Sequence, residues 1–560
     1  MKMSPVQDVR QWFPSDDGNE QDRMQLMKLM EQLMTGFDLL KDPERVNLKG
    51  SKDRSGDFYG QLNESSVIPP QGKAMEDVTR GLIELMHAHP YHTKYFMTNI
   101  LPMASIPGIM GMLAAMLVNG NNLWDVYGPA GAEAEVRVVS MMSKLVGYDH
   151  TRSGGYTTWG GQGAIFTGLR LAIVKFAPDA SRTGVPNNLY AFCSDSAHYS
   201  LYKSMEATGL GSDRLVKIRT RSDSSMDTAD LKWKLEQVIR SGGVPIYIVA
   251  TTGTTDAMGI DDISEIMNIA VQAAAANGLN RPHIHADSAL GGFFAFFNDY
   301  DFALNPLALD METLGALHAI AGKMKHIHLA DTMCFDFQKL GQTPYLTSLL
   351  LVKEAESLRL LDLNPDETPY VGYRGYGQYH TGYTLECSRM ASSISIYSAL
   401  LAFGIEGYQQ LLAQFVSVNL AFRRQLMKEV PEMVIANPDN PGITTLLRIY
   451  ENRISRFQEE LAGECPLDEL LRNNRLNERL FELLGERRDE MFFGDTKKHL
   501  LVLSQEGVEV PLYASKLFVI SPYTQLEHVP AIVGYLKERV DEIYEQYHSP
   551  YQSGRSVEVV

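Results

Sequence analysis

The middle third of this 560-residue chain alternates short apolar segments with longer amphipathic ones. The short runs have the pattern of buried strands, and the longer ones carry apolar residues at helical spacing. A helix between two strands has the length that a parallel connection requires. The pattern therefore predicts an α/β fold, with a mainly parallel sheet covered by helices on both faces. The predicted strands are 189–193, 244–250, 283–286 and 332–336, and the predicted helices are 163–176, 198–207, 228–241 and 263–277.

The chain is too long for a single core, so further domains are expected. Residues 21–40 have helical spacing with a methionine stripe, and we expect this helix to pack on a partner surface. An apolar run at 106–118 is too short to span a bilayer and predicts a buried helix. Long helices dominate from residue 391. We divide the chain into a helical N-terminal and linker segment, a large α/β domain and a smaller α+β domain, at 1–104, 105–390 and 391–560.

Charge and cysteine usage exclude several partners. The net charge is −17, from 51 basic and 68 acidic residues, which argues against nucleic acid or an anionic membrane as a general partner. The N-terminus shows no apolar signal segment, so a cytoplasmic protein is expected. The four cysteines form no CxxC pair, which predicts reduced thiols and no metal site; they are Cys193, Cys334, Cys387 and Cys465.

Lys339 follows directly on the predicted strand 332–336 and precedes the turn residues Gly341 and Pro344. Ligands of open α/β sheets bind outside the carboxyl ends of the strands. A partly desolvated lysine there is expected to have a lowered pKa and to act as an amine nucleophile. An ordinary solvated loop lysine is the alternative.

Other strand ends carry polar residues of the same kind. Asp287 follows a buried strand, where it either pairs with a cation such as a protonated pyridine nitrogen or caps the next helix. A glycine turn with Gly161 precedes a helix and can bind phosphate through backbone N–H groups. It matches neither common nucleotide fingerprint. His198 and the Thr254–Thr255 pair follow two further strands, and each alone is equally consistent with a structural role.

The order glycine turn, His, Thr-Thr, Asp, Lys resembles that of the pyridoxal-phosphate-dependent group II amino-acid decarboxylases, most nearly the bacterial tyrosine and aspartate decarboxylases. The stretch HADSALGG resembles that family's H-x-D-A-A-x-G-G, ADTMCFDFQK its A-D-S-x-x-x-D-P-H-K, and TLECSRM its T-L-E-G-S-R/K. The resemblance runs through roughly residues 85–430. It implies an aspartate-aminotransferase-type large domain, known as PLP fold type I, and a homodimer with active sites at the subunit interface.

The resemblance also implies site roles. Lys339 would bind the cofactor aldehyde covalently, Asp287 would hold the pyridinium proton, and His198 would stack on the ring. Tyr345 is a candidate proton donor to the substrate carbon. The remaining cofactor-binding residues would be Gly161, Gln162, Thr255 and His285.

Three positions depart from the family pattern. Gln338 replaces the histidine before the lysine, Gln162 replaces a serine of the glycine turn, and Cys387 replaces the glycine of T-L-E-G-S. Because glutamine does not shuttle protons, the departure at 338 leaves the reaction type more open than the cofactor.

We expect decarboxylation of an L-amino acid with an aromatic or acidic side chain. Three alternatives stay open: another lyase or aldehyde-forming reaction with the same cofactor, a homologue that binds the cofactor without catalysis, and a nucleotide-binding α/β enzyme. Residues 370–383 contain five tyrosines and four glycines. They predict either a well-packed connection or a lid that closes over the substrate.

Overall fold

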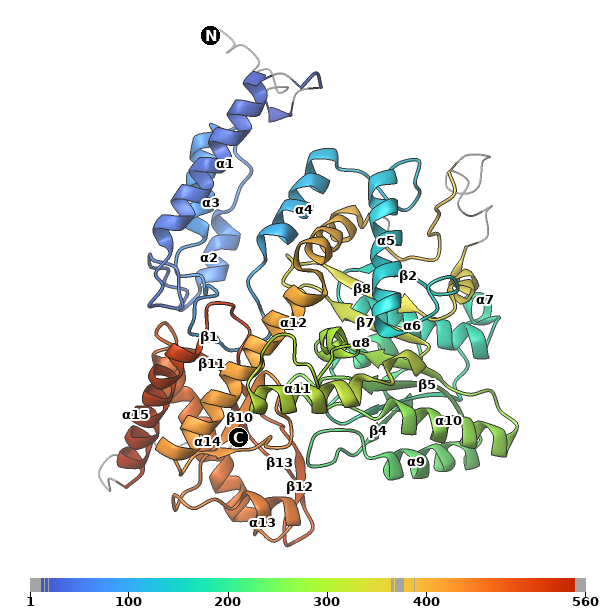
Figure 1. Ribbon diagram of the computed structural model, residues 1–560, viewed down its shortest axis with the longest axis vertical. Coiled ribbons are helices and arrows are strands. Elements are labelled where there is room, and N and C mark those ends of the chain that lie inside the picture. The colour runs from blue at the N-terminus through green and yellow to red at the C-terminus, as the bar shows by residue number, and fades with distance from the viewer. Residues whose placement is uncertain are drawn as a thin grey trace. The chain divides into compact units, whose positions relative to one another are not determined.

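The computed structural model describes residues 12–14, 16–18, 20–363, 367, 377–386 and 388–548 (Figure 1). The chain forms two compact units. The first comprises Met1–Phe96 with Arg487–Phe492, and the second comprises Met97–Glu486 with Phe493–Val560. The division at 104 and 390 drawn from the sequence stays a prediction.

The first unit is helical. It contains α1 (Glu20–Leu40), α2 (Phe58–Ser65) and α3 (Met75–Leu85), and α1 packs against α3. The contact is close at Gly36, where an added Cβ would lie 2.2 Å from Ile83. The methionines of the predicted stripe in α1 are largely solvent-exposed; they include Met24, Met27 and Met34.

The second unit is built on a seven-stranded sheet in the order β2-β8-β7-β6-β5-β3-β4. Pairing is parallel from β4 through β3, β5 and β6 to β7, and β8 is antiparallel to both β7 and β2. The α/β prediction is therefore confirmed, with one reversed strand. The strands are β2 (Gly154–Thr158), β3 (Leu189–Ser194), β4 (Leu215–Ile218), β5 (Val244–Thr251), β6 (His283–Asp287), β7 (Thr332–Asp336) and β8 (Ser348–Val352).

Helices pack against this sheet and against one another. Helices α6 and α8 share a core with the face of the sheet that carries Tyr247 and Val249. The sequence missed β2, β4, β8, α7 and α11, because short or mixed segments leave little periodicity. The helices are α4 (Ile106–Val118), α5 (Pro129–Val146), α6 (Gly161–Phe176), α7 (Ala180–Thr183), α8 (Ser200–Ala207), α9 (Thr228–Arg240), α10 (Ile263–Asn277) and α11 (Met311–Met324).

Helix α4 corrects one expectation. It spans the predicted residues, but it buries only its small side, Gly108, Gly111 and Ala115, against α12. A Cβ at Gly111 would lie 2.7 Å from the backbone of α12. The large apolar residues face solvent, with Ile106 78% and Val118 69% exposed. The run is apolar all round, so its pattern did not distinguish a buried helix from one with an uncovered face.

The C-terminal part contributes most of a five-stranded sheet, β1-β11-β14-β10-β9, against which α14 packs. Helix α15 packs on α12 and α14. Helix α12 is long and apolar enough by length and composition to cross a membrane, yet Gly404 interrupts it and its residues from Tyr408 to Leu426 pack in the core. The elements are β1 (Phe96–Met97), α12 (Met390–Glu429), β9 (Val434–Ile435), β10 (Thr444–Arg448), α13 (Phe457–Ala462), α14 (Leu467–Glu486), β11 (Phe492–Thr496), β12 (Leu501–Leu503), β13 (Glu509–Pro511), β14 (Ala514–Phe518) and α15 (Val529–His548).

Candidate functional site

A cleft opens at the carboxyl ends of β5, β6 and β7. It encloses about 410 Å³, part of it open to solvent. The parallel register places Thr251, the last residue of β5, beside Asp287, the last residue of β6. The cleft is lined by Gly161, Gln162, Ile165, His198, Ser200, Thr251, Gly253, Thr255, Asp287, Ala289, Leu290, Asp336 and Lys339.

Lys339 lies in this cleft, and its Nζ is 3.1 Å from Oδ2 of Asp336. Burial by itself would lower the pKa of Lys339, but the carboxylates of Asp336 and Asp287 outweigh it and hold the pKa above its ordinary value. The expectation of a lowered pKa is therefore wrong for the cofactor-free protein. The sequence pattern gave no sign that two carboxylates face this one amine.

Asp287 is 5% exposed, and within the described part of the chain its carboxylate accepts only long hydrogen bonds. Its Oδ1 accepts the backbone N–H of Ala289 at 3.3 Å and the Cys334 thiol at 3.4 Å. The helical turn that follows is capped at Leu290 without a side-chain bond, so Asp287 is no helix cap. A carboxylate this buried needs a cationic donor, and a pyridinium N–H is one.

The glycine turn begins α6. The N-cap Gly160 has φ 149° and makes no side-chain capping bond, so no side chain shields the first N–H groups of the helix. A Cβ at Gly161 would lie 3.1 Å from Asp336 and 3.2 Å from Ala289. Only glycine leaves this position open, and the exposed helix N-terminus suits a phosphate group.

His198 and Thr255 both line the cleft, from the loops after β3 and β5. The backbone N–H of Ser200 donates to Nδ1 of His198 at 3.2 Å, which orients the ring. Burial lowers the pKa of His198, although Asp287 acts in the opposite direction. The imidazole is therefore neutral near pH 7 and suited to lie against an aromatic ring.

Two residues proposed from the sequence do not line the cleft. His285 is fully buried behind Asp287, where its Nδ1 bonds the Thr332 hydroxyl at 2.8 Å. Its position two residues before Asp287 on β6 places it on the same face but one step deeper. Tyr345 stands near Lys339 on an exposed turn, 49% exposed, with its hydroxyl 3.5 Å from the carbonyl of Ile100.

Gln338, the departure from the family histidine, has a structural contact. Its Oε1 accepts the backbone N–H of Thr347 at 3.0 Å, and its own backbone N–H donates to the Thr347 carbonyl at 3.0 Å. The side chain is buried. Gln338 therefore fixes the turn that follows Lys339.

The sequence missed Asp336, Thr251 and Ser200 as cleft residues. Asp336 was assigned only to the predicted strand 332–336. Thr251 and Ser200 belong to no recognised motif. The Oγ1 of Thr251 and the Oγ of Ser200 are buried and have no hydrogen-bond partner among the described residues. Unpaired buried hydroxyls, an unpaired carboxylate and a bare helix N-terminus together fit a polar, phosphorylated pyridine.

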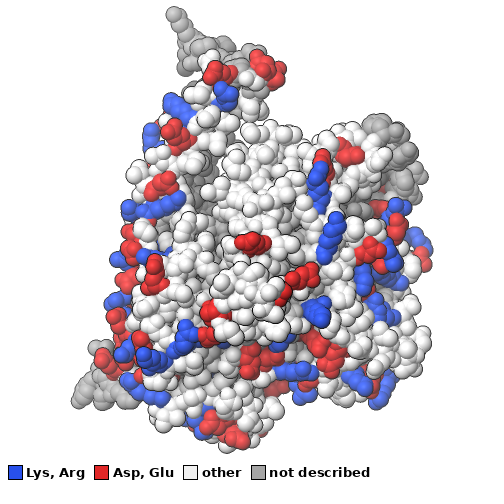
Figure 2. All heavy atoms as spheres, viewed as in Figure 1, with Lys and Arg blue, Asp and Glu red and all other residues white. Residues whose placement is uncertain are grey.

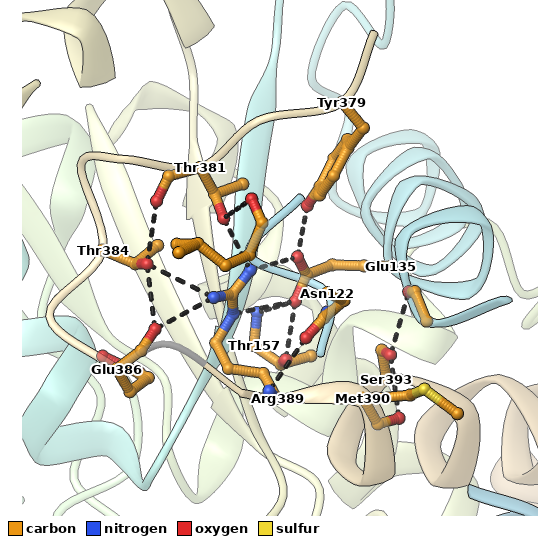
Figure 3. Close-up of polar contacts among 12 residues, drawn as sticks. Asn122, Glu135, Thr157, Tyr379, Thr381, Thr384, Glu386, Arg389, Met390 and Ser393 are labelled. Carbon is orange, nitrogen blue, oxygen red and sulfur yellow. Dashed lines mark hydrogen bonds and ion pairs between the residues drawn. The ribbon is translucent and has the colours of Figure 1, made fainter. Parts of the chain in front are cut away.

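The described part of the predicted lid is anchored rather than free (Figure 3). Tyr379 donates to Glu135 of α5, and Asp125 accepts the backbone N–H groups of Gln378 and Tyr379. Arg389 holds the same stretch through Thr381 and Thr384. Tyr370, Tyr373 and Tyr376, and Cys387 as well, lie outside the described residues.

Known proteins with similar sequences and folds were compared with this chain. Residues 63–307 match the family model described as pyridoxal-dependent decarboxylase conserved domain. Residues 63–307 therefore carry a pyridoxal-dependent decarboxylase domain. An L-2,4-diaminobutyrate decarboxylase of Rhizobium meliloti is 26% identical over 404 residues, 70% of this chain and 72% of that protein. An aspartate 1-decarboxylase of Aliivibrio fischeri is 24% identical over 404 residues, 67% of this chain and 68% of that protein.

Solved structures show the same fold. The structure of Oryza sativa TDC with PLP and tryptamine has a TM-score of 0.74 at 17% identity, covering 94% of this chain and 99% of that one. This decarboxylase therefore has the fold type I architecture, uses pyridoxal phosphate and decarboxylates an amino acid. Lys339 and Tyr345 lie beyond the matched residues 63–307. Of the two, Lys339 lines the cleft.

Proposed function

We propose that this decarboxylase converts an L-amino acid with an aromatic or acidic side chain to its amine, with Lys339 as the residue that binds the cofactor. One observation carries the proposal: Lys339, Asp287, His198 and the N-terminus of α6 converge on a single cleft. Bound pyridoxal phosphate supplies an electron sink for the carbon that loses its carboxylate.

Each residue would then have a defined task. Lys339 Nζ would bond the cofactor aldehyde, and Asp287 would hold a proton on the ring nitrogen. The neutral ring of His198 would cover one face of the cofactor. The N–H groups of Gly161 and Gln162 would bind the phosphate. Thr255 would bond a polar substituent of the ring.

Tyr345 would donate a proton to the substrate carbon. Burial raises the pKa of its phenol above the ordinary value, so the hydroxyl stays protonated at neutral pH. Its exposure on one protomer favours a site that a second protomer completes. His285 is kept as a supporting residue behind Asp287 and not as a contact of the cofactor.

A homodimer is supported by the uncovered apolar surface of the second unit. Helix α4 and the first half of α12 expose large aliphatic side chains, among them Met110, Leu117, Leu401 and Ile405. Figure 2 shows few charged side chains over this face. An apolar patch of this kind marks an interaction surface. A cytoplasmic location is supported by the three described cysteines, which are free thiols.

Light scattering with size-exclusion chromatography tests the dimer. Met110→Glu with Leu117→Glu should give a monomer with greatly reduced decarboxylation, whereas the exposed Met311→Glu on α11 serves as the matched control and should stay dimeric. A double variant that remains a dimer would place the interface elsewhere.

The proposed chemistry is tested by trapping and by product analysis. The purified protein should bind pyridoxal phosphate with a yellow colour, and borohydride should fix the cofactor on Lys339. Lys339→Ala should lose both signals. A protein that still traps cofactor after this change attaches it through another residue.

A panel of aromatic, acidic and basic L-amino acids should then release amine and carbon dioxide from only one class. Basic amino acids are included in the panel because a relative is named a diaminobutyrate decarboxylase. An aldehyde in place of the amine would indicate the oxidative alternative. Cofactor binding without any product would indicate a catalytically inactive homologue.

A further inference from the structure

Asp336 stands between two partners at the bottom of the cleft. Its Oδ1 accepts the hydroxyl of Ser348 at 2.6 Å, and its Oδ2 lies 3.1 Å from Nζ of Lys339. The antiparallel register of β7 with β8 sets Asp336 directly opposite Ser348. Asp336 is 4% exposed, and its hydrogen bond to Ser348 of β8 holds the carboxylate in place.

The other charged groups near Lys339 define what Asp336 can do. Burial raises the pKa of the Cys334 thiol and of the Tyr345 phenol, and burial lowers the pKa of His198. All three are therefore uncharged near neutral pH. Of the described groups that act on Lys339, this leaves the carboxylates of Asp336 and Asp287 as the negative ones.

The two carboxylates are not equivalent. Asp287 ends β6, and its carboxylate makes two long hydrogen bonds to the described residues, which leaves it available to a ring nitrogen. Asp336 already forms an ion pair with Lys339, and the backbone of the turn reinforces it, since the N–H of Lys339 donates to the Asp336 carbonyl at 2.8 Å. Because the backbone sets the position of Asp336 relative to Lys339, this position does not depend on whether Nζ is a free amine or is bonded to another group.

We propose that Asp336 is the counter-ion of the Lys339 nitrogen both before and after that nitrogen bonds to the cofactor aldehyde. The inference rests on the proposed function of Lys339. In the step itself, the C=O bond of the aldehyde breaks and a C=N bond forms to Nζ. The oxygen leaves as water with two of the three ammonium protons, and the third proton stays on nitrogen.

The positive charge on the nitrogen is therefore the same before and after the step. Asp336 stabilises it throughout, so no charge has to enter or leave a buried site. Ser348 holds the carboxylate in position and contributes no charge. The result is a link that remains protonated, and therefore reactive toward a substrate amine, at neutral pH.

The test is a pH titration of the absorbance of the reconstituted holoenzyme. A protonated link absorbs in the visible and an unprotonated one in the near ultraviolet, so the midpoint reports the charge on the nitrogen. Asp336→Asn should lower this midpoint by about one to three pH units, because an opposite charge at this distance shifts a pKa by that amount. Ser348→Ala, the matched control, keeps the charge and should shift the midpoint by less than about one unit.

An unchanged midpoint in folded Asp336→Asn would overturn the inference. If that variant does not fold, the wild type decides: its midpoint must lie above that of the same cofactor linked to butylamine in water, and equal midpoints would also overturn it. A wild type with no visible band and no borohydride adduct on Lys339 would instead refute the proposed function.

Discussion

Two groups of buried polar residues in this decarboxylase differ in how many of their hydrogen-bonding atoms have partners. They are the cluster around Glu135 and Arg389 and the cleft around Lys339. Glu135 and Arg389 pair beneath the start of α12, at 2.9 Å, and are almost wholly buried. Glu135 also accepts both the N–H and the hydroxyl of Thr157, and Arg389 donates to Thr381, Thr384 and the carbonyl of Glu386 (Figure 3). Each charge has a full set of partners inside the protein.

The cleft around Lys339 has the opposite character. In the part of the chain that the structure describes, Asp287 accepts only long hydrogen bonds, and the hydroxyls of Thr251 and Ser200 are buried without partners. Unsatisfied buried polar groups are expensive unless a ligand completes them. The difference separates a cluster that stabilises the fold from a site that is complete only with its cofactor.

Asp287→Asn should give the largest effect. It should reduce turnover and leave the stability of the fold nearly unchanged. The variant should still bind cofactor but lose several orders of magnitude in turnover, because no carboxylate would hold the ring proton. Its free energy of unfolding without cofactor should change by no more than about 1 kcal/mol, since Asp287 has few partners to lose. Steady-state kinetics and urea titration measure the two quantities. Near-normal turnover would make Asp287 a structural residue.

Arg389→Ala should show the reverse pattern. It leaves the buried carboxylate of Glu135 without a cation, which costs about 3–5 kcal/mol of unfolding free energy. The paired change Glu135→Met with Arg389→Met removes both charges and should recover most of that loss. Urea titration of the single and double variants measures this. A single variant as stable as the wild type would show that the cluster is dispensable.

Tyr379→Phe should have a smaller effect on the same cluster. Losing a hydrogen bond to a charged partner costs about 1.5–3 kcal/mol and should release residues 377–386. Limited proteolysis should cut this stretch in the variant and spare it in the wild type, with or without a substrate analogue. Protection by the analogue at 377–386 in the wild type would restore the lid prediction for this part of the loop.

Lowering the pH should reduce the free energy of unfolding, because two buried histidines lie on β6, the strand that carries Asp287. Burial lowers the pKa of His283 and of His285 from 6.5 to about 3. Because these folded-state values lie below the unfolded ones, the unfolded chain takes up protons first as the pH falls. The stabilisation is complete above pH 6.5 and declines toward pH 3.

Between pH 6.5 and pH 5 we expect a loss of about 2 kcal/mol per histidine, measured by urea titration of the cofactor-free protein. His283→Gln is the matched variant and should halve this dependence. An unchanged slope would mean that His283 is already protonated in the folded protein.

The sequence by itself determined the alternation of strands and helices and the positions of strand ends, because both depend on local periodicity. Lys339, Asp287, His198 and Thr255 were therefore predictable as neighbours, because the carboxyl ends of parallel strands meet at one edge. Gly161 follows β2, a strand that the sequence did not reveal. The sequence did not show that His285 lies below the cleft, because a two-residue period gives the face of a strand and not the depth along it.

Only the tertiary structure decided which charges meet. The Asp336–Ser348 contact depends on the reversed strand β8, and the Glu135–Arg389 pair joins residues 254 positions apart. The raised pKa of Lys339 and the solvent-exposed face of α4 also depend on how distant segments pack together. Contacts of this kind arise from packing between distant segments, which no local spacing in the chain records.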